Sequence, residues 1–319
     1  MGSDVTKASG ADRRLTGAQF QGLAAMPAEA EWFANLANDN TRRGYERALK
    51  DFMAFVGTNG PQDFRVVTRA HILAWRKALE LQGASGATIR HRLAALSSLF
   101  EWLCDANAVM HNPLKGVRRP SVESYEGKTP ALGDHQARAL LEAPAADTLK
   151  GRRDRAILAT LLYHGLRRAE LCKLRVDDAR QQRRGVVHLA VQGKGGKTRY
   201  LPLHPAAGAR IAEYLDVAGH GGEARGALFR PIHRARAEGV DQALTPDAVY
   251  KMVRGYSARI GREVGAHAMR ATAATNALDH QADITKVQEW LGHANIATTK
   301  IYDRRATSPE DSPTFKVAY

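Results

Sequence analysis

Four short patterns in the second half of the chain contain residue types that are suited to chemistry on a phosphate. Arginine binds phosphate oxygens with paired donors, and its charge does not titrate away. Histidine, lysine and tyrosine can move protons or act as nucleophiles. In chain order, the patterns are Gly165-Leu166-Arg167-Arg168-Ala169-Glu170-Leu171, Gly193-Lys194-Gly195-Gly196-Lys197-Thr198-Arg199, His267-Ala268-Met269-Arg270, and Leu291-Gly292-His293 followed by Tyr302.

Chemistry on a phosphodiester explains why these residue types belong together. A phosphodiester repels a nucleophile, and the attack builds further negative charge on the phosphorus, so fixed positive donors are required. A tyrosine nucleophile has an ordinary pKa of about 10 and needs a proton acceptor. The departing oxygen needs an acid in turn.

The ordered set of patterns resembles the tyrosine recombinase (lambda-integrase) superfamily, in its Xer and phage-integrase branch. That family reads G-L-R-x-x-E-L, then G-K-G-x-K-x-R, then H-x-L-R, then L-G-H with a tyrosine nine residues later. Each fragment alone is a weak signal, but all four occur here in the family's order. The resemblance covers roughly residues 30 to 305.

The resemblance implies which residues stabilise the reacting phosphate. Arg167 and Arg270 match the two catalytic arginines, and His293 matches a histidine that adds a donor to a nonbridging oxygen. Glu170 matches an acidic residue that supports the site without taking part in the reaction. Arg167 and Glu170 are also spaced as a simple i, i+3 ion pair on a helix, which is the alternative interpretation.

The resemblance also implies a nucleophile and two proton carriers. Tyr302 matches the nucleophile, His267 the residue that takes its proton, and Lys194 the acid for the departing 5′-oxygen. The bond energy would be kept in a 3′-phosphotyrosine, so cleavage and rejoining are expected to need no metal, no ATP and no other cofactor. The hairpin glycines lack the G-x-x-x-x-G-K-[ST] spacing of a nucleotide-binding loop.

Two positions depart from the family pattern. Ala271 stands where the family commonly has a histidine after the second arginine, although that position is outside the catalytic set. Arg168 follows the catalytic arginine where an aliphatic residue is frequent, and its role is open. The G-L-R frame selects Arg167 rather than Arg168 as the catalytic residue.

The residues between 28 and about 112 read as a small bundle of four or so helices. The clearest helix is 88–103, in which Ile89, Leu93, Leu96, Phe100 and Leu103 recur at steps of three and four. Segments 41–56 and 68–81 show similar apolar faces. Basic outer faces could contact phosphates, or they could simply be solvated. The candidate DNA contacts are Arg42, Arg43, Arg47, Arg90 and Arg92 here, and Lys197 and Arg199 beside the catalytic motifs.

The rest of the chain divides by composition. We expect a disordered leader at 1–27, a helical core-binding domain at 28–112 closed by Asn112-Pro113, and a Pro-rich linker at 113–130. A catalytic domain at 131–305 combines helices with one hairpin, 185–192 paired with 199–203. Thr245-Pro246 predicts a helix start. A tail follows at 306–319, where Phe315, Val317 and Tyr319 could anchor a neighbouring protomer.

The composition limits the classes of protein to which the chain can belong. The chain has 319 residues, 47 Lys plus Arg and 33 Asp plus Glu, a net charge of +14, and two cysteines. These counts favour a soluble, two-domain, cytoplasmic protein with a polyanionic partner, and they disfavour a disulfide scaffold. The longest apolar run, 156–163, is too short for a membrane span. No signal peptide is evident.

The fold class implied by the resemblance is mainly α with a small β-hairpin or sheet. A SAM-like helical core-binding domain and a tyrosine-recombinase catalytic domain would form a clamp around duplex DNA. Four protomers, possibly including a second recombinase, would act on paired inverted core sites through a four-way junction. The outcome would be integration and excision, or dimer resolution. Too few residues precede the helical bundle for a separate arm-binding domain.

Two alternatives stay open. A type IB topoisomerase uses the same catalytic residues but relaxes DNA without a defined site. The Xer-like helical bundle and hairpin motif argue against it. A regulatory DNA-binding protein could keep the fold and lose catalysis, but such a chain should have lost part of the catalytic set, and all six residues remain.

Overall fold

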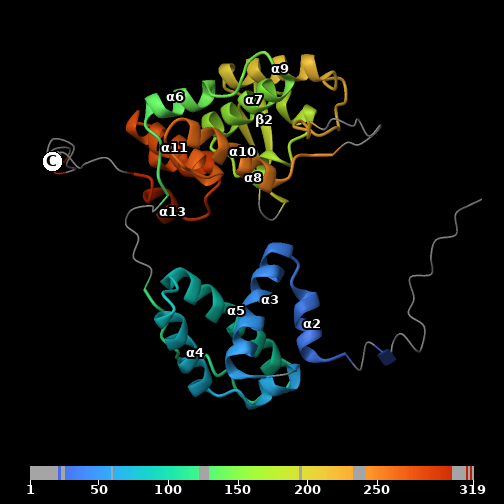
Figure 1. Cartoon of the computed structure of the whole chain (residues 1–319), viewed down its shortest axis with the longest axis vertical. Helices are drawn as coiled ribbons and strands as arrows, with labels where there is room; N and C mark the ends of the chain where they lie inside the picture. The colour runs from blue at the N-terminus through green and yellow to red at the C-terminus, as the bar shows by residue number, and fades with distance from the viewer. Residues whose placement is uncertain are drawn as a thin grey trace, which may run out of the picture. The chain divides into compact units, whose positions relative to one another are not determined.

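The protein folds into two compact units, residues Met1–Glu123 and Ser124–Tyr319, each with a hydrophobic core of its own (Figure 1). The computed structural model describes the residues 21–22, 26–58, 60–121, 129–193, 196–232, 242–303, 314 and 317. The expected leader and tail therefore lie almost entirely outside the described residues. Of the three proposed tail anchors, only Val317 is described, and it is exposed. No helix in these described ranges is long and apolar enough to cross a membrane.

The first unit is a helical bundle. Its elements are α2 (Ala28–Asn35), α3 (Asp39–Val56), the 3₁₀ helix η1 (Pro61–Val66), α4 (Arg69–Leu81) and α5 (Gly86–Asp105). Side-chain caps start two of these helices, because Asn38 accepts hydrogen bonds from the backbone at the start of α3 and Ser85 from Thr88 in α5. Both helices begin two residues before the segments that the sequence predicts.

The apolar stripe of α5 forms the centre of this unit. All five residues of the predicted stripe are buried, which confirms the helical face that the sequence predicts. Trp75 of α4 packs edge-on against Phe52 of α3, with their ring centroids 5.1 Å apart. Such an arrangement stabilises a core beyond the area that it buries.

The segment after α5 is tied to the helical unit. α5 ends at Asp105, before Asn112-Pro113, and Leu114 is buried in the helical core. Three arginines of α4 and α5 donate hydrogen bonds to backbone carbonyls of residues 115–120. The pairs are Arg69 to Lys115, Arg76 to Arg118 and Arg90 to Pro120. The first part of the expected linker thus packs with the first unit, and residues 122–128 lie outside the described part.

The second unit combines helices with one small sheet, in agreement with the predicted fold class. Its helices are α6 (Asp134–Glu142), α7 (Leu149–His164), α8 (Arg168–Leu171), η2 (Val176–Ala179), α9 (Pro205–Ala218), α10 (Pro246–Arg259), α11 (Ala266–Asp279), α12 (Ile284–Leu291) and α13 (Ala297–Lys300). Thr245 caps α10 by accepting a hydrogen bond from the backbone N–H of Ala248, so the predicted helix start is confirmed.

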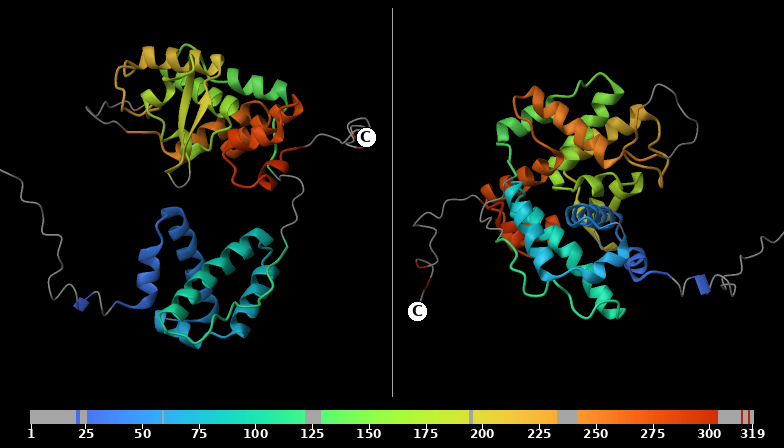
Figure 2. Two further views of the ribbon diagram at one scale, coloured as in Figure 1. Left: turned by 180° about the vertical axis from the view of Figure 1, so that it is seen from behind. Right: turned by 60° about the horizontal axis from the view of Figure 1, so that its bottom comes forward.

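Helix α7 lies at the centre of this unit. It is buried on nearly every side, and α6, α9 and α11 pack against it (Figures 1 and 2). A helix in this position has no polar face, so it lacks the one-sided periodicity of a surface helix. Its buried polar groups are paired: Asp154 accepts hydrogen bonds from Arg153, Lys150 and the hydroxyl of Tyr256.

The sheet has three antiparallel strands in the order β1 (Gln181–Arg183), β2 (Val186–Gln192) and β3 (Thr198–Pro202). The predicted hairpin is β2 with β3, whereas β1 is an additional strand that the sequence did not predict. In the register of β2 and β3, Val191 pairs with Arg199 and Leu189 with Leu201. Successive side chains alternate between the faces of a sheet, so Arg199 shares the buried face with these residues.

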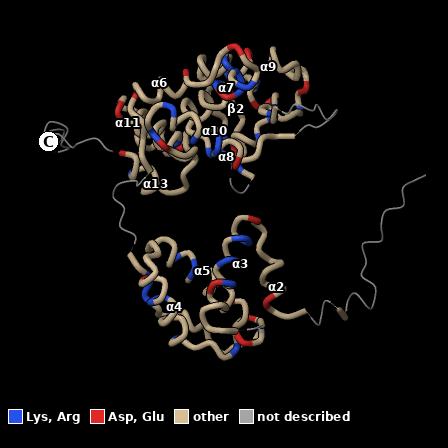
Figure 3. The backbone as a smooth tube through the Cα atoms, viewed as in Figure 1, with Lys and Arg blue, Asp and Glu red and all other residues tan. Residues whose placement is uncertain are grey.

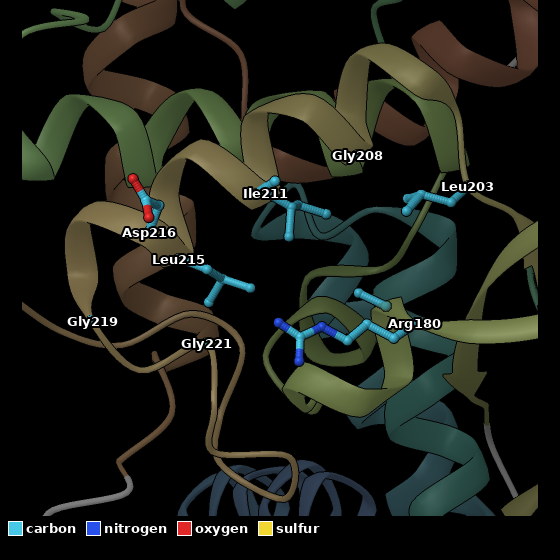
Figure 4. A pocket seen from close by; sticks show the side chains of 10 residues that line it. Arg180, Leu203, Gly208, Ile211, Leu215, Asp216, Gly219 and Gly221 are labelled. Carbon is cyan, nitrogen blue, oxygen red and sulfur yellow. The ribbon is translucent and has the colours of Figure 1, made fainter.

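A pocket of about 490 Å³ lies where α9 faces the end of η2 (Figure 4). Ile211 and Leu215 of α9 line it, and the side chain of Arg180 reaches toward them from the opposite wall. The pocket shares no residue with the predicted catalytic set, so it is separate from the candidate active site.

Candidate active site

Five of the six predicted catalytic residues lie in described parts of the second unit. Arg167 precedes α8, His267 and Arg270 lie on α11, His293 follows α12, and Tyr302 follows α13. Lys194, which the sequence puts between β2 and β3, lies outside the described residues. Hydrogen bonds, ring contacts and mutual charge effects join all five described residues into one cluster, although they are separated by up to 135 positions in the sequence.

Glu170 anchors the Arg167 end of this cluster. Its carboxylate accepts hydrogen bonds from the backbone N–H of Arg167 at 2.9 Å and from the Arg167 guanidinium at 2.7 Å. The first of these contacts caps the short helix α8. Glu170 is buried, whereas the Arg167 side chain is 42% exposed. The ion pair therefore orients the Arg167 guanidinium and leaves part of it open to a ligand.

Arg199 of β3 completes the surroundings of Glu170. Its guanidinium donates to both carboxylate oxygens, at 3.1 and 2.8 Å, and its side chain is only 16% exposed. Burial alone would raise the pKa of Glu170, but hydrogen bonds from Arg199 and Arg167 outweigh it and lower the pKa. The sequence suggested Arg199 as a DNA contact. Arg199 and the buried Leu201 are two positions apart on β3, so their side chains lie on the same face of the sheet. This alternation indicates that the Arg199 side chain faces the protein interior.

Arg270 is the most buried charge of the cluster, with 1% exposure. Its two terminal nitrogens donate to the backbone carbonyls of Gly165, at 2.6 Å, and Leu291, at 2.7 Å. Burial and the neighbouring Arg167 lower the pKa of Arg270 to about 10. Its Nε is buried and has no hydrogen-bond partner among the described residues. A buried donor without a partner is costly, so this nitrogen is an unsatisfied donor inside the cluster.

Gly165 makes the Arg270 contact possible. It ends α7 with a φ of +58°, a left-handed conformation that glycine adopts without strain. A Cβ at this position would lie 2.7 Å from Cδ2 of Leu291. The close approach of these two backbone segments brings both carbonyls within reach of one guanidinium.

Tyr302 and His267 face each other. The Tyr302 hydroxyl lies 3.5 Å from Nε2 of His267, at the outer limit of a hydrogen bond. Burial raises the pKa of Tyr302, while the charges of Arg270 and Arg167 oppose that change. Burial, followed by the same two arginines, lowers the pKa of His267. The imidazole is therefore neutral near pH 7 and able to accept the phenolic proton.

His293 lies on the other side of Tyr302. The two rings are stacked at 20°, with centroids 6.1 Å apart. Burial and the charges of Arg270 and Arg167 lower the pKa of His293 to about 4. Its Nδ1 lies 2.9 Å from the hydroxyl of Thr299, a buried residue of α13 that sequence reasoning did not select.

A cavity of about 670 Å³ opens beside these residues. Arg167, His293 and the exposed Lys197 line it, together with Arg199. In the described part of the chain, no group of three His, Cys, Asp or Glu side chains is arranged to hold a metal ion. The lining contains three basic side chains and one acidic side chain, Glu289, so it is positively charged on balance and can take an anion of the size of a phosphate group.

Comparison with known sequences decides the family. The sequence profile described as "Phage integrase family" matches residues 131–308, and the profile "Phage integrase, N-terminal SAM-like domain" matches residues 33–107. The chain belongs to the phage integrase family. All five described cluster residues lie within the first of the two matches.

Relatives among characterised proteins narrow the enzyme class of this integrase. The chain is 32% identical over 269 residues to "Tyrosine recombinase XerD" of Listeria innocua, covering 82% of this chain and 87% of the relative. It is 35% identical over 274 residues to "Tyrosine recombinase XerC" of Pelobacter propionicus, covering 82% and 84%. The protein is therefore a site-specific recombinase of the tyrosine type, and the resemblance noted in the sequence is confirmed.

A solved structure shows the same fold. A lambda integrase fragment (75–356), solved as a dimer bound to a COC′ core site, matches with a TM-score of 0.66 at 17% identity. The alignment covers 88% of this chain and 94% of that one. At this level of identity, the likeness supports the integrase fold and carries no information on individual residues.

Figure 3 marks the Lys and Arg positions along the backbone of the SAM-like unit, and the contacts of these side chains differ. Arg92 is half-buried and pairs with Asp51 at 2.7 Å, and Arg42 donates to the backbone carbonyl of Leu36. By contrast, Arg43, Arg47 and Arg90 are exposed. Arg43 and Arg90 also donate hydrogen bonds, to Asn40 and to the carbonyl of Pro120. Of the five candidate DNA contacts in this integrase unit, Arg47 is therefore the best placed for an external ligand.

Proposed function

We propose that this recombinase cleaves and rejoins DNA through a 3′-phosphotyrosyl intermediate on Tyr302. The observation that supports this proposal best is the convergence on one phenol of a neutral imidazole, His267, and a buried arginine, Arg270. A base next to the nucleophile and fixed positive charge next to the reacting phosphate are the two requirements of such a reaction.

The first step is the attack of Tyr302 on the scissile phosphate. His267 accepts the phenolic proton as Oη forms its bond to phosphorus, and the bond from phosphorus to the 5′-oxygen breaks. Lys194 gives a proton to that oxygen, which leaves as a hydroxyl. In rejoining, a 5′-hydroxyl attacks the phosphotyrosine and the same groups exchange protons in reverse, so no external energy source is consumed.

The charge that develops on the phosphate is met by three donors. Arg167 offers the part of its guanidinium that Glu170 does not occupy, and Arg270 offers its unpartnered Nε. His293 adds a neutral donor from the cavity wall. Because these groups are already held by protein contacts, they need little reorganisation when the charge appears.

We further propose that four copies assemble on two DNA sites with paired inverted core sequences and exchange strands through a four-way junction. The solved relatives include a lambda integrase tetramer bound to a Holliday junction, which supports this arrangement. The reaction would serve integration and excision, or dimer resolution. The exposed basic residues of both units, including Lys197, would contact the DNA backbone.

A trapping experiment tests the nucleophile. A duplex containing a core site with a nick close to the cleavage point should accumulate a covalent protein–DNA adduct, visible on a denaturing gel. Tyr302→Phe should form none, since the attacking oxygen is missing. Tyr163→Phe is a matched control, because Tyr163 stacks on His204 outside the cluster.

Each outcome of the trapping experiment has a clear meaning. An adduct that persists in Tyr302→Phe contradicts the assignment of Tyr302. Relaxation of any supercoiled plasmid by the wild type, without a defined site, would indicate a topoisomerase instead.

A further inference from the structure

His293 can serve as a neutral donor only if the correct ring nitrogen has the hydrogen. A neutral imidazole has one N–H, and the partner of the other nitrogen decides which of the two tautomers is present. Burial and the nearby arginines keep His293 neutral around pH 7. The donor function therefore depends on whatever contacts Nδ1.

Thr299 is the residue in contact with Nδ1. Its hydroxyl lies 2.9 Å from that nitrogen, and the residue is 0% exposed. Within the described residues this is the only hydrogen bond of the hydroxyl group. If Nδ1 had the hydrogen, the threonine O–H would point into the protein interior without an acceptor, which is costly. If the hydroxyl donates to Nδ1, both groups are satisfied and the ring hydrogen resides on Nε2.

Hydrogen bonds hold the backbone of His293 in place. The N–H of His293 donates to the carbonyl of Gln288 at 3.1 Å, and the side-chain amide of Gln288 donates to the carbonyl of His293 at 3.0 Å. The carbonyl of Thr299 also accepts a hydrogen bond from the N–H of Tyr302 at 3.0 Å. Thr299 thus contacts the donor with its side chain and the nucleophile segment with its backbone.

We propose that Thr299 is a positioning residue that holds His293 in the Nε2–H tautomer, so that this N–H donates to a nonbridging oxygen of the scissile phosphate. The second half of this inference rests on the proposed function, while the first half concerns the protein without DNA. The two halves can therefore be tested separately.

The substitution Thr299→Val isolates the hydroxyl. Valine has nearly the shape of threonine, and the backbone contact to Tyr302 does not depend on the side chain. Loss of one hydrogen bond of this kind should reduce the rate of adduct formation about 3- to 10-fold. Thr299→Ser keeps a hydroxyl and should recover most of that loss.

The tautomer is read directly by ¹⁵N nuclear magnetic resonance on histidine-labelled protein without DNA. The two ring nitrogens of a neutral histidine have well-separated shifts, and the resonances of His293 are identified by their loss in His293→Gln. Wild type and Thr299→Ser should show predominantly the Nε2–H form. Thr299→Val should show a clear increase in the Nδ1–H form.

A control separates this effect from loss of a buried hydroxyl in general. Thr160 is also fully buried, and its hydroxyl donates to the carbonyl of Ala156 within α7. Thr160→Val should therefore leave both the tautomer of His293 and the adduct rate near wild type.

The outcomes distinguish the inference from the proposed function. Predominant Nδ1–H in the wild type, or an unchanged tautomer in Thr299→Val, overturns the role of Thr299 whatever the activity is. A tautomer that changes without any change in adduct rate overturns the donation to phosphate. Failure of the proposed function itself would appear as an adduct that does not depend on Tyr302.

Discussion

At the level of single residues, the chemistry of the site depends on which histidines are neutral. His267 and His293 lie beside Arg167 and Arg270, and burial adds to the effect of these charges. Both influences disfavour the imidazolium form. A site rich in arginine therefore keeps both histidines neutral, as the proposed roles of base and neutral donor require.

Titration of the protein without DNA tests this balance. We expect His267 to titrate below its ordinary pKa of 6.5 and His293 near pH 4. Nuclear magnetic resonance measures both titrations through the shifts of the ring resonances. Both residues bind a proton more weakly in the folded than in the unfolded chain. Below pH 6.5 the unfolded chain therefore takes up these protons before the folded chain does. The free energy of unfolding is not reduced by these two groups above pH 6.5, and it falls as the pH drops below that value.

Two variants assign the signals, His267→Asn and His293→Asn, each of which removes one titration. DNA should raise both pKa values, because the phosphate brings negative charge next to the rings. A pKa above 6.5 for either histidine in the DNA-free protein would contradict the role of burial and arginine charge in keeping these rings neutral.

At the level of elements, Glu170 connects the hairpin to α8. The carboxylate contacts Arg167 at the start of α8 and Arg199 on β3, the second strand of the hairpin. The position of the hairpin relative to Arg167 therefore depends on one buried carboxylate.

Replacement of this carboxylate should be costly. Glu170→Gln leaves the largely buried guanidinium of Arg199 and the half-exposed guanidinium of Arg167 without a counter-charge, and we expect a loss of about 2 kcal/mol in unfolding free energy at pH 7. The pKa of Glu170 is lowered in the folded state, so its contribution is present above pH 4.5 and is lost as the pH falls through the folded pKa. The difference from wild type should shrink accordingly in acid.

Urea unfolding at pH 7 and pH 3 measures the difference in unfolding free energy between wild type and Glu170→Gln. Hydrogen exchange of the β3 amides shows whether the loss occurs in the second unit. Glu142→Gln is a matched control, because Glu142 also pairs with two arginines, Arg155 and Arg210, but its side chain is 51% exposed. We expect a change below about 1 kcal/mol there. Equal losses in both variants would show that burial of Glu170 is not the cause.

The same elements show how far the sequence predicts the structure. The apolar face of α5 was predictable because one side is buried and the other is exposed. Strand β1 was not, since Gln181–Arg183 is short and polar and has no apolar alternation. The pairing of Arg199 with Glu170 joins residues 29 positions apart, and local spacing has no signal for such a contact. The ordered motifs were enough to select the residues that cluster in the candidate site, whereas Thr299 required the three-dimensional contact.

At the level of the whole molecule, the net charge of +14 includes both buried and exposed basic side chains. Arg270, Arg199 and Arg153 are largely buried and hold the second unit together. Apart from the arginines proposed to meet the scissile phosphate, only the exposed basic residues can replace the counterions of a DNA backbone. Total charge therefore overstates the number of phosphate contacts, and the structure indicates which residues to test.

Arg47 and Arg92 form a matched pair for that test. Arg47 is exposed on α3 and has no ion pair with a described residue, whereas Arg92 on α5 pairs with Asp51. In a filter-binding series over salt concentration, Arg47→Gln should reduce the slope of log K against log salt by about 0.9, the value for one lost phosphate contact. Arg92→Gln should leave that slope unchanged and lower the thermal stability of the first unit instead. The reverse pattern would mean that the half-buried arginine, and not the exposed one, lies on the DNA.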